Sequence, residues 1–231
     1  MEMNERIEYA IRHTEVIRAP KQKLATFGVT TIVYYLITEP VYDGVFGDAK
    51  ETVVRDGTVI SERPKIVTPS YLTKLEGFGE NARSYIHKLV KERPNAPGLF
   101  YSYRNELRQV DVLSSPLEAV AERLNDELDK VENPLTAIIK GVDSLWDVSL
   151  LKFIAELTEQ SVRANVADLR GEGLMGVGED GVTVHARRMI EQLFEQCRED
   201  PSCASELRLE LERWGLWPEY EDRFLNLFRS R

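Results

Sequence analysis

The stretch Val29-Thr-Thr-Ile-Val-Tyr-Tyr-Leu-Ile-Thr38 carries the strongest fold signal in the chain. Most of its residues are β-branched or aromatic, and these are the types that favour strands. Apolar side chains occupy both sets of alternating positions, which is typical of a strand that is covered on both faces. We therefore predict a central strand over residues 29–38, in a sheet that is buried on both sides.

Other segments of the N-terminal half also suggest strands. Asp56-Gly57 lies between two β-branched runs and predicts a hairpin over residues 51–60. Residues 99–113 predict a second hairpin that turns near Arg104. Residues 5–18 fit a period of two and a helical period about equally, and the strand is favoured because β-branched residues are frequent there.

Helical signals begin in this half and then dominate the rest of the chain. Pro69-Ser70 opens one short helix, and a second is expected around Tyr85 to Val90. Ser115-Pro116-Leu117-Glu118 has the hydroxyl N-cap, the proline and the acidic residue of a helix start. Helices are expected from there to residue 131, over 134–142, from Asp147, and in a short piece that begins at Asn165. Three more follow the glycine-rich stretch 171–182.

These signals predict an α+β protein. The N-terminal half is strand-rich, with an antiparallel or mixed sheet and two helices, and the C-terminal half is all-helical and acidic. We divide the chain into a sheet-rich region 1–114, a helical region 115–170 that packs on it, a glycine-rich linker 171–182 and a small C-terminal helical subdomain 183–231.

Charge is spread unevenly along the chain. Residues 1–110 contain 16 basic and 14 acidic side chains, a net charge of +2, whereas residues 111–231 contain 14 and 25, a net charge of −11. Binding to the phosphate backbone requires clustered Lys and Arg. The C-terminal half is therefore not expected to bind nucleic acid, although a local basic site in the first half remains open.

The termini and cysteines point to a soluble cytoplasmic protein without a membrane segment. The chain starts Met-Glu-Met-Asn-Glu-Arg with no apolar run behind it, and no stretch approaches the ~20 apolar residues of a membrane span. In that compartment Cys197 and Cys203 are expected to be reduced thiols, with a local disulfide across Asp200-Pro201 as the alternative. No third cysteine or nearby histidine indicates zinc.

The densest basic run of the chain suggests an anion site. It contains Arg12, His13, Arg18, Lys21 and Lys23. On a strand, Arg12 and Arg18 would share one face, and two guanidinium groups can hold a phosphate or carboxylate in bidentate fashion. The alternative is an edge strand that charge protects from aggregation. The candidate ligand-binding residues are Arg12, His13, Arg18, Lys21 and Arg104.

Catalytic and cofactor motifs are largely missing from the sequence. Gly176-Val-Gly-Glu-Asp-Gly181 matches the dinucleotide fingerprint, but helix and loop precede it and two acidic residues would repel phosphates. A linker or tight hairpin is the better interpretation. Because the three histidines lie on different elements, we predict neither a metal nor a cofactor.

The C-terminal residues are rich in aromatic side chains, which anchor interfaces well because they bury large areas. The chain is therefore expected either to contact a partner or a second copy here, or to dock its last helix on its own core. The candidate partner-contact residues are Trp214, Trp217, Tyr220, Phe224 and Phe228.

Two functional hypotheses follow. The favoured one is a non-catalytic binding or regulatory protein, in which the sheet-rich half presents a ligand or partner surface. The alternative is an enzyme that acts on a phosphorylated or carboxylated small molecule through the cluster of Arg12, His13 and Arg18. Nucleic-acid binding by the same basic run is a third hypothesis, with less support.

Overall fold

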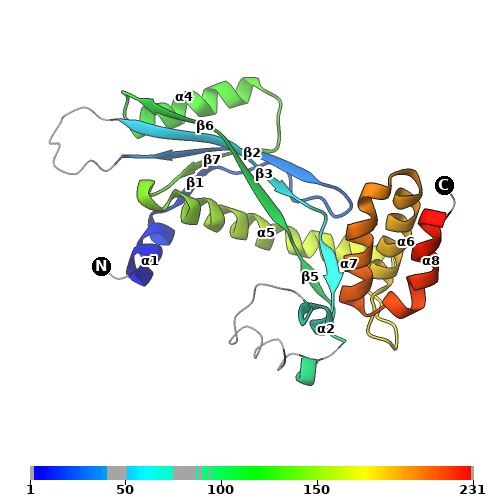
Figure 1. The fold of residues 1–231 in the computed structure, drawn as a ribbon. Coiled ribbons are helices and arrows are strands. Elements are labelled where there is room, and N and C mark those ends of the chain that lie inside the picture. The colour runs from blue at the N-terminus through cyan, green and yellow to red at the C-terminus, as the bar shows by residue number, and fades with distance from the viewer. Residues whose placement is uncertain (1–2, 41–50, 75–86, 88–89, 94, 230–231) are drawn as a thin grey trace. The chain divides into compact units, whose positions relative to one another are not determined.

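The computed structural model describes residues 3–40, 51–74, 87, 90–93 and 95–229 (Figure 1). The chain forms two compact units, and each combines two separate stretches. The first unit comprises Met1–Arg63 and Tyr101–Asn165, and the second comprises Pro64–Phe100 and Val166–Arg231. The division into four consecutive regions stays a prediction about the chain.

A five-stranded mixed sheet forms the centre of the first unit. Its order is β1-β7-β2-β3-β6, and all neighbours are antiparallel except β2 and β7, which run parallel. The strands are β1 (Glu15–Arg18), β2 (Thr30–Thr38), β3 (Thr52–Ser61), β6 (Tyr103–Leu113) and β7 (Thr136–Lys140).

The predicted central strand is confirmed, because β2 lies in the middle of this sheet with a helix on either face (Figure 1). Helix α5 (Trp146–Gly171) covers one face, where Tyr34 and Leu36 are buried with Phe153. Helix α4 (Leu117–Lys130) covers the other face and packs on Ile37. The apolar pattern on both sides of β2 thus reflects a layer of helix on each side.

The predicted α+β class is confirmed, with a mixed sheet in the N-terminal half and mostly helices in the C-terminal half. A helix also begins close to the predicted start, since α4 begins at Leu117, but its N-cap is Pro116 and not the predicted Ser115, and no side chain caps the helix there.

Residues 5–18 do not form the single strand that we favoured. Helix α1 (Met3–His13) occupies most of the segment, and only Glu15–Arg18 forms a strand. In the helix, Ala10 is fully buried, and its carbonyl accepts a hydrogen bond from the Thr14 hydroxyl at 2.7 Å. Both periodicities were present in the sequence, and packing selected the helical one.

Both predicted hairpins are wrong, because β3 and β6 are each continuous and pair with one another along their length. At Asp56-Gly57 the chain does not turn. Gly57 instead lies opposite Tyr34 of β2, and the register with β6 shifts by one residue. Glycine is required there for space rather than for a turn, because the Tyr34 ring lies directly over it.

Two expected helices also differ in the structure. Within 134–142 the chain forms strand β7, since the short apolar run fits between β2 and β1 and periodicity cannot separate a buried strand from a buried helix. Asn165 does not start a helix but lies inside α5, where its amide donates to Leu24 O at 2.9 Å and Thr26 Oγ1 at 2.8 Å.

The second unit contains a two-stranded sheet and the C-terminal helices. The expected short helix at Pro69 and the three predicted C-terminal helices are confirmed. Its elements are β4 (Lys65–Val67), α2 (Pro69–Leu72), β5 (Gly98–Phe100), α6 (Val184–Glu199), η2 (Pro201–Cys203), α7 (Ala204–Trp214) and α8 (Trp217–Arg229). A further short helix, η1 (Asp143–Leu145), precedes α5 in the first unit. The helix expected around Tyr85 falls largely outside the described residues.

Cys197 and Cys203 form a disulfide in this structure, so the expectation of two reduced thiols is not met. The α6 helix ends at Glu199, and the turn through Pro201 brings the two Cα atoms within 5.5 Å of one another. Among the described residues, no helix is both long enough and apolar enough to cross a membrane.

We predict that Gly57→Ala destabilises the first unit by about 1–3 kcal/mol, the usual cost of overpacking a core. A Cβ atom at this position would lie 2.5 Å from the Tyr34 hydroxyl oxygen and 2.8 Å from the backbone oxygen of Glu106. Urea unfolding measures the change. Gly28→Ala is the matched control because a Cβ there meets open space, and equal stability losses in the two variants would contradict the prediction.

Candidate functional site

The structure brings together only two of the five candidate ligand-binding residues. Arg18 and Lys21 line one cleft in the first unit. Arg12 and His13 lie on exposed turns of α1, where their side chains contact the carbonyl oxygens of Glu8 and Tyr9. Arg104 lies on β6 and pairs with Glu106 at 3.0 Å. The five side chains therefore do not converge on one cavity.

The cleft around Arg18 and Lys21 has a volume of about 340 Å³. Arg18 ends β1, and Lys21 follows it in the connection to β2. The backbone N–H of Lys21 donates to Pro134 O at 2.8 Å, which fixes this connection beside the loop between α4 and β7. The lining residues are Arg18, Lys21, Leu128, Asp129, Val131, Glu132, Asn133 and Pro134.

Arg18 is held rigidly at the wall of this cleft. Its side chain is only 11% exposed, and its Nη1 atom donates to Asn125 Oδ1 at 2.8 Å and to Asp129 Oδ1 at 2.7 Å. The hydrogen bond from Arg18 lowers the pKa of Asp129 below its usual range. Asp129 is therefore an ionised carboxylate near neutral pH.

Lys21 differs from Arg18 because its charge is not neutralised by a direct contact. Among the described residues its ammonium group has no hydrogen bond or ion pair, and Asp129 acts on it only through longer-range attraction. Glu132 on the same cleft is exposed and likewise has no partner in the described part of the chain. The cleft thus offers one cation and one carboxylate that are free to bind a ligand.

The size and charge of the cleft suit a small molecule that carries both signs of charge. Its volume lies at the lower end of the usual range for ligand sites, about 300–1,000 Å³. Leu128 and Asp129, in the last turn of α4, also line this cleft, and a helix C-terminus favours cations. An acidic group would face Lys21, and a cationic group would face Glu132 and the end of α4.

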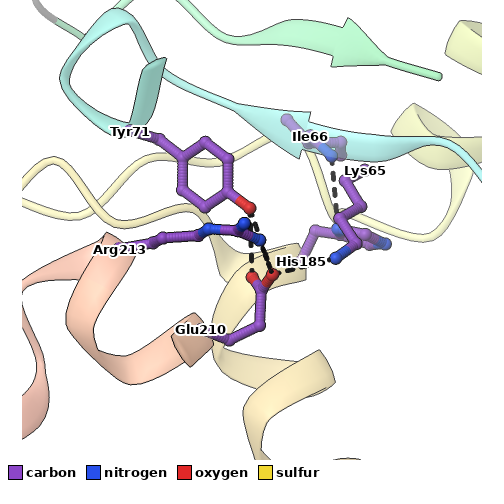
Figure 2. A network of polar contacts seen from close by, with 6 residues as sticks. All are labelled: Lys65, Ile66, Tyr71, His185, Glu210 and Arg213. Carbon is purple, nitrogen blue, oxygen red and sulfur yellow. Dashed lines mark hydrogen bonds and ion pairs between the residues drawn. The ribbon is translucent and has the colours of Figure 1, made fainter. Parts of the chain in front are cut away.

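A second polar cluster lies within the second unit and surrounds Glu210 of α7 (Figure 2). Glu210 is only 7% exposed, and Figure 2 shows three donors converging on its carboxylate. Lys65 Nζ donates at 3.0 Å, the Tyr71 hydroxyl at 3.1 Å and Arg213 Nη1 at 3.1 Å. These contacts join β4 and α2 to α7.

Burial and the neighbouring carboxylate shape the chemistry of this cluster. Burial, and then the charge of Glu210, raise the pKa of Tyr71 to about 12, so Tyr71 remains a proton donor at neutral pH. His185 of α6 accepts a hydrogen bond from the backbone of Ile66 through Nδ1 at 3.4 Å. The adjoining cavity has a volume of only about 20 Å³, enough for about one water molecule. The cluster therefore links elements of the unit and leaves no room for a ligand.

Sequence reasoning missed this cluster, although one signal for it was present. Leu207, Leu211 and Trp214 form the apolar face of α7, and Glu210 follows the same spacing. A carboxylate on the apolar face of a helix needs buried partners. Its partners Lys65 and Tyr71 are more than 130 residues away, and no local pattern indicates them.

The aromatic candidates of the C-terminus lie mainly in the core of the second unit. Phe224 is buried there, and Trp214, Trp217 and Tyr220 pack against that core. Phe228 is 48% exposed and contacts Phe224 edge-on. Phe228 is thus the member of this set that is most accessible to a partner.

Comparison with family models, curated proteins and solved structures finds no match for this chain. Its function is therefore argued from the geometry of its own residues. The described part of the chain contains no group of three His, Cys, Asp or Glu side chains placed to hold a metal ion.

We predict that Glu210→Gln destabilises the second unit by about 2–4 kcal/mol, because Lys65 and Arg213 lose their shared counter-charge. Chemical unfolding followed by tryptophan fluorescence reports this through Trp214, whose ring lies 4.8 Å from that of Tyr71. Glu206→Gln is the control, since Glu206 lies one turn earlier on α7 and is exposed. Similar losses in both variants would rule out a special role for Glu210.

We predict a loss of stability in the second unit as the pH rises from about 10 to about 12. In the unfolded chain a tyrosine ionises near 10, whereas the folded pKa of Tyr71 is about 12, so alkali favours the unfolded state across this window. Unfolding measured at several alkaline pH values tests this. Tyr71→Phe should flatten the dependence, and an unchanged slope in that variant would assign it to other groups.

Proposed function

We propose that this chain is a non-catalytic binding protein that holds a small charged molecule in the cleft of Arg18 and Lys21. The ligand would carry a carboxylate or phosphate group together with a cationic group. The observation that carries the proposal is the unneutralised Lys21 ammonium beside a rigid Arg18, in a cleft of about 340 Å³.

The fixed orientation of the Arg18 side chain supports ligand binding in this cleft. Asn125 and Asp129 already orient its guanidinium group, so little side-chain entropy is lost when a ligand arrives. Lys21, in contrast, still has all three donors of its ammonium group for a ligand acceptor. The pair thus combines a rigid guanidinium group that is already paired with Asp129 and an ammonium group that can adapt to a ligand.

Binding is better supported than catalysis at this cleft. A general acid must carry a proton near neutral pH, but Arg18 lowers the pKa of Asp129. The alternative enzyme would use Arg12 and His13 as well, and neither of these lines the cleft. The expected activity on a phosphorylated or carboxylated substrate therefore has less support than simple binding.

The other proposed partners have less support. A homo-oligomer or protein contact through the C-terminal helices would depend on Phe228 and its exposed neighbour Leu225, because the other aromatic candidates pack in or against the core. Isolated exposed apolar side chains are common on protein surfaces. Nucleic acid is not part of the proposal, since two carboxylates, Asp129 and Glu132, lie on the same cleft and would repel a phosphate backbone.

We predict that Lys21→Ala weakens ligand binding about 10–100-fold, the cost of one charge-assisted hydrogen bond. Suitable probes are phosphate and succinate, which carry only negative charge, and glutamate and phosphoethanolamine, which carry both signs. NMR titration should show the second pair binding more tightly, with shifts at residues 18–21 and 128–134.

Lys23→Ala is the matched control, because Lys23 belongs to the same basic run and is exposed but does not line the cleft. The Lys23→Ala variant should bind the probes with the same affinity as the unmodified chain. Equal weakening in the two lysine variants, or no shifts at the cleft with millimolar probes, would overturn the proposal.

A further inference from the structure

Strand β6 forms one edge of the five-stranded sheet and is unusually open. It is 11 residues long, and every residue from 104 to 112 is exposed. Within the described residues no strand pairs with its outer side. A long exposed edge presents unpaired backbone groups, and such an edge recruits further strands unless it is protected.

The first half of β6 carries protection of the usual kind. Arg104 and Glu106 place charges on the edge and pair with one another at 3.0 Å. Arg108 is skipped in the pairing between β3 and β6 and so forms a bulge, and its side chain donates to Asp56 at 2.7 Å. Charges and bulges of this kind discourage edge-to-edge pairing.

The second half of β6, Gln109-Val-Asp-Val-Leu113, lacks this protection. It pairs with residues 52–56 of β3 in a regular register, contains neither lysine, arginine nor proline, and has Asp111 as its single charged side chain. Val110 and Val112 share one face and are 50% and 56% exposed. The unprotected half of the edge therefore combines free backbone groups with an apolar ridge.

We propose that a second copy of this chain binds here, so that the two β6 strands pair antiparallel about a two-fold axis at Val110. The dimer would join the two sheets into one continuous ten-stranded sheet. This two-fold pairing is isologous and closed, so it ends at two copies.

The charges of the strand favour this register over one centred on Asp111, and Arg108 of each copy then lies opposite Val112 of the other at the ends of the pairing. With the axis at Val110, the two valines face each other and Gln109 of each copy lies opposite Asp111 of the other. Gln109 Nε2 already donates to its own Asp111 at 2.9 Å, so the two side chains share a face and the carboxylates keep free acceptor sites. An axis at Asp111 would place two carboxylates directly opposite one another, which is destabilising.

The oligomeric state tests the proposal through Val110→Lys. Sedimentation equilibrium from 1 to 200 µM should show a dimer of the unmodified chain, and the variant should weaken it about 10-fold because the valine contact is lost and two like charges meet at the axis. Val29→Lys is the control, since Val29 is 64% exposed in the same unit but lies outside β6. A single-chain mass throughout, or a dimer that Val110→Lys does not weaken, would overturn the proposal.

A cysteine at the axis provides an independent measurement. Opposed residues of antiparallel strands have Cα atoms about 4.5–5.5 Å apart, which is within disulfide range. Val110→Cys should therefore give an oxidised, cross-linked dimer on a gel, whereas Val29→Cys should not. Cross-linking by Val112→Cys in place of Val110→Cys would show a different register and would overturn the pairing proposed.

Discussion

The sheet of the first unit depends on the close contact between Tyr34 and Gly57. Tyr34 is fully buried on β2, and its ring lies over the one position of β3 that has no side chain. From there its hydroxyl group donates to Asn105 Oδ1 of β6 at 2.9 Å. One side chain thus spans three strands and fixes the register of the edge strand. Because register decides which residues of β6 face outward, this contact also determines which part of the edge is unprotected.

The fold could be predicted where a segment's pattern allowed only one outcome. Residues 29–38 are apolar on both faces and rich in β-branched side chains, and Ser115-Pro116 is a local helix start, so each prediction agrees with the structure to within one residue. The failures share a cause. Residues 5–18 and 134–142 fit two periodicities, and the choice was made by packing between distant segments. Asp56-Gly57 has the composition of a turn, but the reason for its glycine is a tyrosine 23 positions away in the sequence.

The candidate site was predictable only in part, for the same reason. Arg18 and Lys21 are close in sequence and remain close in space, so the basic run pointed to them correctly as neighbours. Arg12 belongs to the same run, but the end of α1 separates it from them, and this break was hidden by the ambiguous periodicity. Asp129 and Asn125, which orient Arg18, lie more than 100 residues further along the chain. Contacts between residues so far apart in the chain cannot be predicted from a single sequence.

The polar clusters around Glu210 and around Lys21 differ in whether their charged side chains are already paired. A cluster whose charges are all paired stabilises the fold, whereas an unpaired charge can bind a ligand. Glu210 receives hydrogen bonds from three donors, and the neighbouring cavity has room for little more than one water molecule. A ligand could therefore bind there only by breaking the hydrogen bonds of this network. Lys21 has the opposite character, because its charge lies on a cleft of ligand size without a direct partner among the described residues. A ligand that pairs with Lys21 would gain a charge-assisted bond and break none, and for this reason we propose the cleft, and not the Glu210 cluster, as the binding site.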